Sequence, residues 1–343
     1  MSDQPSDQRS AHTELRVPRV ALVVNPRPCA GPRARVAAAA IARLRASSCV
    51  AAEVETRGDA DDASRIAAAL EQARADVAVA AGGDGTVGLV VAALLRLPEE
   101  ARPALAILPL GTGNNTARSF GLRSLRRERD RAVELAVAAI TSGARRAIDV
   151  GFVGERPFLG AFAVGLDGEI LRLRNRMQRH FEAAGARTGY GLYLASFALS
   201  FVSAQRRFGA RIVLDGVEER RMLYNAVVTN APVYAGPLRF DGENDCADGL
   251  LDLHAVASAA RYVAEYPRAW LRYLRVLHGA HAAPSPLLLR AREILVELDR
   301  PVAALIDGEE IDAAPCYRLH VLPRAIRVCT PAVTIPAASA PRR

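Results

Sequence analysis

The stretch AVAAGGDGT at residues 78–86 joins a short apolar run to a glycine-rich turn. The residues that follow, 87–96, have the apolar spacing of a helix, so the glycines occupy a strand-to-helix turn. Because glycine has no Cβ, its backbone N–H groups can approach a phosphate closely, and the N-terminus of the following helix favours negative charge. The stretch therefore predicts an α/β fold that binds an anion at this turn.

Short apolar runs alternate with helical patterns on both sides of this turn. The apolar runs lie at 20–24, 77–81 and 105–108, and the helical patterns cover 33–45, 61–74 and 87–96. Such alternation predicts a parallel sheet covered by helices. Asp61 and Asp62 stand at the start of the second helical pattern, where we expect them to cap the helix.

A different pattern begins at Asp149, after a charged helical stretch at 125–142. Runs typical of β-strands follow at 158–164, 211–214, 226–229, 250–256 and 294–298, interrupted by helical stretches at 169–208 and 260–278. This change predicts a second, mostly β domain. We therefore expect an α/β domain over 19–148 and a β-rich domain over 149–330, with a disordered tail at 1–18 and a further tail at 331–343.

The composition excludes several kinds of chemistry. All 45 basic residues are arginine, so a Schiff-base lysine, a P-loop lysine and a protein-kinase strand lysine are all ruled out. The five cysteines are scattered without a CxxC pair, which argues against a disulfide framework and a zinc site. The formal net charge of +8 is weak evidence for a polyanionic partner, because a high-GC genome by itself enriches arginine. We expect no nucleic-acid partner, since the arginines are spread along the chain without an aromatic-basic platform.

The N-terminal end and the apolar runs bear on where the protein works. The first 17 residues are polar and lack the apolar core of a signal peptide. The longest charge-free run, 190–205, is too short to span a bilayer. These observations predict a cytoplasmic protein.

Two further turns follow apolar runs in the same way. The run at 105–108 leads to the glycine-rich turn 111–115, and the run at 20–24 leads to an Asn-Pro turn at 25–31. Because the carboxyl ends of adjacent parallel strands meet at one edge of a sheet, we expect these turns to face one crevice. Asp84 would repel a phosphate unless a divalent cation lies between them, and the alternative role for this residue is a helix cap.

Several motifs extend this pattern over nearly the whole chain, from about residue 19 to about residue 330: the Asn-Pro turn at 25, GGDGT at 82–86, LPLGTGNN at 108–115, DGLLDL at 248–253 and IDGEEI at 306–311. Together they resemble the diacylglycerol kinase catalytic-domain family, which includes bacterial lipid kinases and sphingosine kinases. The resemblance implies a Rossmann-like nucleotide-binding domain followed by a β-sandwich lipid domain. It also implies ATP as the phosphoryl donor, Mg²⁺ as a cofactor and phosphorylation of a lipid hydroxyl.

The resemblance assigns roles to the residues that match the family motifs. The nucleotide contacts are implied to fall on Asn25, Thr56, Gly82, Gly83, Asp84, Gly85, Thr86, Val87, Gly88 and Thr112. A structural magnesium site is implied at Asp245, Asp248 and the backbone of Leu250, where the alternative is a simple acidic loop. The chain departs from the family pattern at Leu89 and Asn115, where the family usually has Glu and Asp.

The family's proton acceptor is implied to lie in the DGE motif, on Asp307 or Glu309. Attack of a lipid hydroxyl on a γ-phosphoryl group needs such a carboxylate within hydrogen-bond reach of the hydroxyl. The same residues are typical of a hairpin turn, and the two roles are compatible. Asp84, Asp307 and Glu309 thus form the expected catalytic set.

These expectations combine into an ATP-dependent lipid kinase, with diacylglycerol as the first candidate substrate and a sphingoid base as the second. A lipid substrate implies a peripheral encounter with a membrane surface. The arginines at 172–207 suit an anionic surface, and a solvated arginine face beside a core helix explains them equally well. The alternative functions are a kinase of a soluble nucleotide or sugar phosphate, and a non-catalytic lipid or nucleotide sensor. A homodimer is left open.

Overall fold

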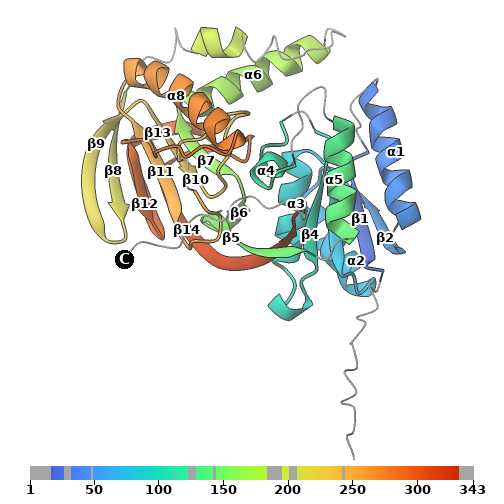
Figure 1. Ribbon diagram of the computed structural model, residues 1–343. Helices are drawn as coiled ribbons and strands as arrows, with labels where there is room; N and C mark the ends of the chain where they lie inside the picture. The colour runs from blue at the N-terminus through green and yellow to red at the C-terminus, as the bar shows by residue number, and fades with distance from the viewer. Residues whose placement is uncertain are drawn as a thin grey trace, which may run out of the picture.

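The computed structural model describes residues 17–26, 32–47, 49–111, 113–122, 129–141, 144–183, 195–200, 207–241 and 244–331. Most of the two predicted tails lies outside these ranges, as does the predicted site residue Thr112. Two regions of different architecture lie side by side in the described chain, an α/β region and a β-rich region (Figure 1).

The α/β region is built on four parallel strands in the order β2-β1-β3-β4. They are β1 (Arg19–Val24), β2 (Cys49–Glu55), β3 (Val77–Gly82) and β4 (Ala104–Pro109). Every residue of β3 and β4 is buried, as expected for strands that are covered on both faces. The covering helices are α1 (Pro32–Ser47) beside α5 (Arg129–Thr141), and α2 (Asp62–Gln72) beside α3 (Asp84–Leu94). The short helices η1 (Glu99–Ala101) and α4 (Asn115–Ser119) flank β4.

The structure differs from the sequence prediction at β2 and at the start of α3. The apolar pattern missed β2, because its apolar run is limited to residues 49–52 and its second half alternates exposed Glu53 and Glu55 with buried Val54. α3 begins at Asp84 rather than at residue 87, because extended Gly83 is its N-cap. The glycine-rich turn is therefore the first turn of the helix.

The β-rich region contains mostly antiparallel strands. They are β5 (Arg145–Val153), β6 (Arg156–Phe158), β7 (Ala161–Gly165), β8 (Phe208–Leu214), β9 (Val217–Leu223), β10 (Asn225–Thr229), β11 (Leu251–Val256), β12 (Leu288–Ala291), β13 (Glu293–Ile306) and β14 (Glu309–Cys329). Helices α6 (Leu166–Ala183) and α8 (Ala259–Leu277) lie together on one side of these strands (Figure 1). Within the described ranges, no helix combines the length and apolar character needed to cross a bilayer.

The predicted helical stretch over 169–208 extends too far at its C-terminal end. α6 covers Leu166–Ala183, a further helical segment covers 195–200, and Phe208 already opens β8. In β8, Phe208, Ala210 and Ile212 are buried while the residues between them are partly exposed. Burial of every second residue is typical of a β-strand, so the helical pattern does not extend to Phe208.

β14 belongs to both regions. Tyr317 and Leu319, in its middle, pack in the core of the β-rich region, whereas Ile326 and Val328, near its end, pack in the core of the α/β region. Val328 pairs in parallel with Leu105 of β4. One continuous sheet therefore runs through the described parts of both regions.

The glycine-rich turns after β3 and β4 approach each other closely. A Cβ added at Gly111 would lie 2.4 Å from the Cα of Gly83, and one added at Gly82 would lie 2.2 Å from Oγ1 of Thr86. Gly111 also donates its N–H to Gly82 O at 3.1 Å. Gly111 is required because the backbone of the other turn leaves no room for a side chain, and Gly82 because the Thr86 side chain fills the space.

We expect Gly111→Ala to lower the free energy of unfolding by about 2 kcal/mol, because the new methyl group meets backbone atoms that cannot move aside. Gly88→Ala is the matched control: a Cβ there has nothing within 4 Å, so the change should be neutral or raise the stability by up to about 1 kcal/mol. Urea denaturation of both variants provides the measurement. Equal stabilities for the two variants would show that the turns do not constrain each other.

Candidate active site

A cleft of about 830 Å³ opens where β1, β2 and β3 end. Its lining comes from the end of β2, from the loops after these strands, from α2 and the N-terminal half of α3, and from the β13–β14 hairpin. The lining residues are Asn25, Pro26, Glu53, Val54, Glu55, Thr56, Arg57, Gly58, Arg65, Ala69, Gly83, Gly85, Thr86, Leu89 and Glu309. Residues of both regions thus meet at the carboxyl edge of the parallel sheet. Of the three turns expected to face one crevice, those after β1 and β3 line the cleft, whereas the described residues of the turn at 111–115 do not.

Asp62 fixes the loop after β2 on one side of this cleft. Its buried carboxylate accepts hydrogen bonds from the N–H groups of Arg57 at 2.9 Å and Gly58 at 2.8 Å, and it pairs with Arg65. Burial acts to raise the pKa of Asp62, but these donors outweigh it, so the pKa lies below the ordinary value of 3.8. The expected helix cap is wrong: Asp61 is the N-cap of α2 without a side-chain bond, and Asp62 points back at the loop.

Asp84 joins the two glycine-rich turns. Its carboxylate accepts hydrogen bonds from the N–H groups of Asn115 at 3.1 Å and Thr116 at 3.0 Å, at the start of α4. This is the helix-cap role, although the capped helix is α4 rather than Asp84's own helix. Oδ1 of Asn115 in turn accepts the N–H of Gly236 at 2.8 Å, which ties α4 to the β-rich region.

Asp307 anchors the tip of the β13–β14 hairpin. Its carboxylate accepts hydrogen bonds from the N–H groups of Leu159, Gly160 and Ala161 at 2.8–2.9 Å. The turn has φ of 49° at Asp307 and 82° at Gly308, which confirms the predicted hairpin. Burial raises the pKa of Asp307 to about 6 against the lowering effect of the three donors, and the nearby carboxylate of Asp84 raises it further.

Glu309 reaches from this hairpin to the N-terminus of α3. Its Oε1 lies 3.0 Å from the position of a Cβ at Gly85, and its Oε2 accepts a hydrogen bond from Arg156 at 2.6 Å. Both partners of this ion pair are about half exposed. Glu310 points elsewhere, since its Oε2 accepts a hydrogen bond from Asn175 on α6 at 3.1 Å. The hairpin therefore brings one carboxylate, that of Glu309, into the cleft.

The structure places the sequence-predicted nucleotide residues unevenly. Asn25, Thr56, Gly83, Gly85 and Thr86 line the cleft together with Glu309. The other described members of the set lie beside it. Gly82 ends β3, the Asp84 carboxylate binds the start of α4, the Val87 side chain is buried in the core, and Gly88 lies within α3. Sequence reasoning missed Arg57, an exposed cation in the lining next to Thr56. Leu89, one of the departures from the family pattern, also lines the cleft.

The predicted magnesium residues lie in the turn before β11. The carboxylate of Asp245 pairs with Arg146, and Asp248 accepts the N–H of Leu250 at 3.0 Å. Burial raises the pKa of Asp248, which disfavours its charged form. Within the described parts of the chain, no three acidic, His or Cys side chains gather closely enough to hold a metal ion. The implied set of two carboxylates and the backbone of Leu250 is smaller than such a cluster, so magnesium binding at this turn stays a prediction.

A glycine-rich helix N-terminus that faces a carboxylate from a second region suits phosphoryl transfer. Comparison with known sequences agrees: residues 19–153 match the family described as "Diacylglycerol kinase catalytic domain". Residues 160–330 match "YegS C-terminal NAD kinase beta sandwich-like domain". The chain belongs to the diacylglycerol kinase catalytic-domain family and is a lipid kinase, which confirms the predicted family, fold class and enzyme class.

Individual relatives cover most of the chain. A diacylglycerol kinase of Mycobacterium tuberculosis is 30% identical over 322 residues, which are 91% of this chain and 95% of the relative. A Pectobacterium atrosepticum protein named "Probable lipid kinase YegS-like" is 30% identical over 79% of this chain and 83% of its own. The crystal structure of a Bacillus anthracis diacylglycerol kinase shares the fold, with a TM-score of 0.68 at 22% identity over 93% of this chain and 99% of the other. Membership in this kinase family implies the use of ATP.

We expect Asp62→Asn to lower the free energy of unfolding near neutral pH by about 2 kcal/mol, because the amide loses charge-assisted hydrogen bonds to the loop. The native pKa of Asp62 lies below its unfolded value, so the ionised carboxylate stabilises the fold above that value. This stabilisation is lost as the pH falls through the lowered pKa. The difference in free energy of unfolding between the wild type and Asp62→Asn should therefore become smaller below about pH 4.

Urea denaturation across this pH range provides the measurement. Asp61→Asn is the control, since it removes the same charge from an exposed neighbour whose side chain makes no cap bond. If the free energy of unfolding of the wild type exceeds that of Asp62→Asn by the same amount at every pH, the ionised carboxylate does not hold the loop.

Proposed function

We propose that this lipid kinase transfers the γ-phosphoryl group of ATP to the hydroxyl of diacylglycerol, with a sphingoid base as the second candidate acceptor. The observation that carries the proposal is the meeting of Glu309 with the N-terminus of α3 in one cleft. The name of the M. tuberculosis relative supports diacylglycerol as the first candidate. No comparable observation favours a soluble acceptor or a non-catalytic sensor.

ATP phosphates would lie against the first turn of α3. Gly83, Gly85 and Thr86 line the cleft there, and the first-turn N–H groups of a helix have no partners within the helix. Arg57, exposed in the same lining, adds a positive charge to a chain that has no lysine. Asp62 holds the backbone of Arg57 and Gly58, so this side of the cleft is preorganised.

Glu309 is proposed as the proton acceptor, and Asp307 as the residue that positions it. Both oxygens of Asp307 already accept backbone N–H groups, whereas Glu309 is half exposed in the cleft. The acceptor hydroxyl attacks the γ-phosphorus, its proton passes to the Glu309 carboxylate, and ADP leaves. We take magnesium to enter with ATP as part of the substrate.

A membrane surface is the proposed meeting place with the lipid. The predicted arginine stretch supports this only in part. Arg172 lies 3.9 Å from Glu310, Arg174 bonds to Asn175, and Arg187 and Arg206 lie outside the described residues. Association with a membrane from the cytoplasmic side stays a proposal.

The test of the proposed reaction is an assay with labelled ATP, Mg²⁺ and single lipids in mixed micelles. We expect labelled phosphatidic acid from diacylglycerol at a higher kcat/KM than the product from a sphingoid base. Soluble nucleotides and sugar phosphates serve as controls. Labelling of one of these in preference to both lipids would overturn the proposed acceptor.

We expect Glu309→Gln to lower kcat by about 100- to 10,000-fold, with little change in the KM for ATP, because the amide cannot take up the hydroxyl proton. The fold should be retained, since the lost ion pair with Arg156 is half exposed. Glu310→Gln is the matched control, because its side chain points to α6. Steady-state kinetics on both variants decide the point, and near-wild-type turnover in Glu309→Gln would assign the proton acceptor to another residue.

A further inference from the structure

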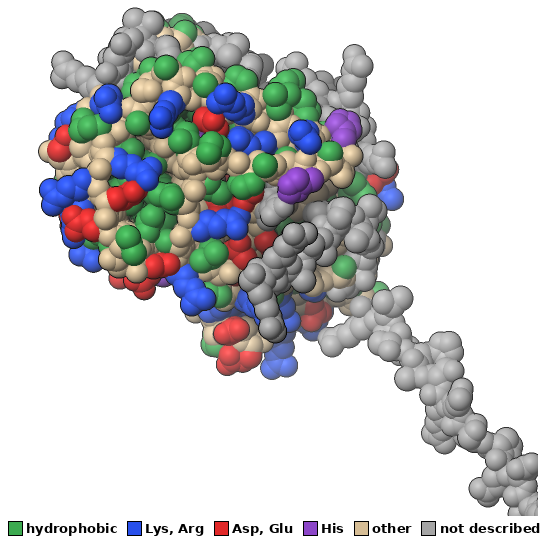
Figure 2. Space-filling view, turned by 60° about the vertical axis from the view of Figure 1, so that its left-hand side comes forward, with side chains coloured by type: hydrophobic (Ala, Val, Ile, Leu, Met, Phe, Trp, Pro, Cys, Tyr) green, Lys and Arg blue, Asp and Glu red, His purple; other side chains and the backbone are tan. Residues whose placement is uncertain are grey.

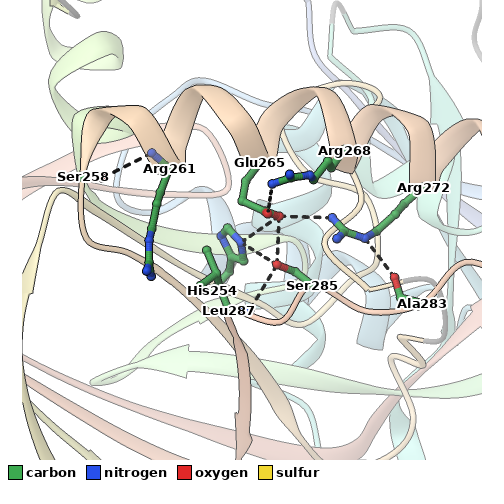
Figure 3. Close-up of polar contacts among 9 residues, drawn as sticks. All are labelled: His254, Ser258, Arg261, Glu265, Arg268, Arg272, Ala283, Ser285 and Leu287. Atoms are coloured by element: carbon green, nitrogen blue, oxygen red, sulfur yellow. Dashed lines mark hydrogen bonds and ion pairs between the residues drawn. The ribbon is translucent and has the colours of Figure 1, made fainter.

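One face of α8 is fixed firmly against the β-rich region. Glu265, buried beneath the helix, accepts hydrogen bonds from Arg268 at 3.1 Å, Arg272 at 3.5 Å and Ser285 at 3.0 Å (Figure 3). The hydroxyls of Tyr262 and Tyr266 donate to the Asp167 carboxylate at 2.7 Å each. These bonds fix the rotation of α8 about its axis, and so they fix which side chains face outwards.

The outward face carries large apolar side chains. Val263 is 53% exposed, Trp270 45% and Leu271 52%. Their spacing of seven and eight residues places them on one side of the helix, which also bears exposed Pro267. A surface helix normally presents polar residues to water, so a contiguous apolar stripe of this kind marks an interaction surface.

A row of arginines lies along one side of this apolar stripe. Arg261, Arg268 and Arg275 follow one another at seven-residue intervals, and all three are exposed. Glu265 is the only acidic residue from 253 to 292, and it is buried and paired with arginines. In Figure 2, blue and green side chains lie next to each other over the upper part of the face shown, with few red ones among them. The outer face of α8 thus combines apolar groups with charge of a single sign.

We propose that this face docks the kinase on an anionic lipid bilayer. α8 would lie in the plane of the interface, with Val263, Trp270 and Leu271 entering the apolar layer and the arginines contacting lipid phosphates. The charge supports a bilayer as the occupant, because an anionic surface complements arginines that have no exposed acidic neighbour on the helix. The inference rests on the proposed function in one respect, that a lipid acceptor gives the enzyme a reason to bind membranes.

Trp270 is the only tryptophan in the chain, so the full-length protein reports on this surface directly. We expect its fluorescence to shift to the blue on vesicles of phosphatidylcholine mixed with phosphatidylglycerol, and to be quenched by brominated acyl chains. Vesicles of phosphatidylcholine alone should give a much smaller response. High salt should weaken the binding, because it screens the arginines.

Substitutions at exposed positions separate docking from folding. Leu271→Asp should weaken vesicle binding by about tenfold or more, because it removes an inserted side chain and adds a negative charge. Arg261→Ala should weaken it by about fivefold, the effect of one basic residue near such a surface. Val217→Asp on β9, at a position 71% exposed, is the matched control and should bind as wild type does. Circular dichroism should show all three variants folded.

The kinase assay distinguishes this proposal from the proposed function. Leu271→Asp should phosphorylate a dissolved short-chain diacylglycerol as wild type does, but should lose activity towards long-chain diacylglycerol held in anionic vesicles. Absence of phosphorylation of any lipid, together with a shifted Trp270 spectrum, would overturn the proposed function and support docking. Vesicle binding without a change at Trp270 would overturn the α8 surface. A dimer that Leu271→Asp dissociates would also overturn it, because the occupant would then be a second copy of the chain.

Discussion

Three backbone N–H groups, from Leu159, Gly160 and Ala161, hold the carboxylate of Asp307, and the active site depends on this contact. It fixes the hairpin tip, and the tip carries Glu309 to the first turn of α3. Burial disfavours the ionised form of Asp307, and the nearby carboxylate of Asp84 disfavours it further. The pKa of Asp307 is therefore raised to about 6. The geometry therefore separates two roles within one short motif, with Asp307 bound to the backbone and Glu309 exposed to the cleft.

The parts of the structure that the sequence predicted are local ones. An apolar run, a glycine turn and a helix at 77–94 follow one another in the chain, so their pattern alone indicated a strand, a turn and a helix. The hairpin at Asp307 and Gly308 was predicted for the same reason. That Glu309 lies at the α3 N-terminus was expected only from the family resemblance, since residues more than two hundred positions apart leave no periodic signal.

The errors also have a common physical cause. Asp62 and Asp84 precede or begin helices, where a local pattern predicts a cap for the adjoining helix. Each instead accepts N–H groups from another segment, Asp62 from the loop at 57–58 and Asp84 from the start of α4. The choice among nearby N–H donors is decided by tertiary packing, which a single sequence does not show. Asp62 thereby supports the cleft instead of capping its own helix, while the catalytic role of Asp84 stays a prediction.

The path of β14 has a consequence for how the protein is made. The four parallel strands are complete by residue 109, yet the core that they form also needs Ile326 and Val328. On the ribosome, the nucleotide-binding half must therefore remain unfinished until more than two hundred further residues have been synthesised. The two halves should then melt as one cooperative unit, because neither core is closed without the same strand. Exchange of either half between relatives by recombination would have to preserve this shared strand.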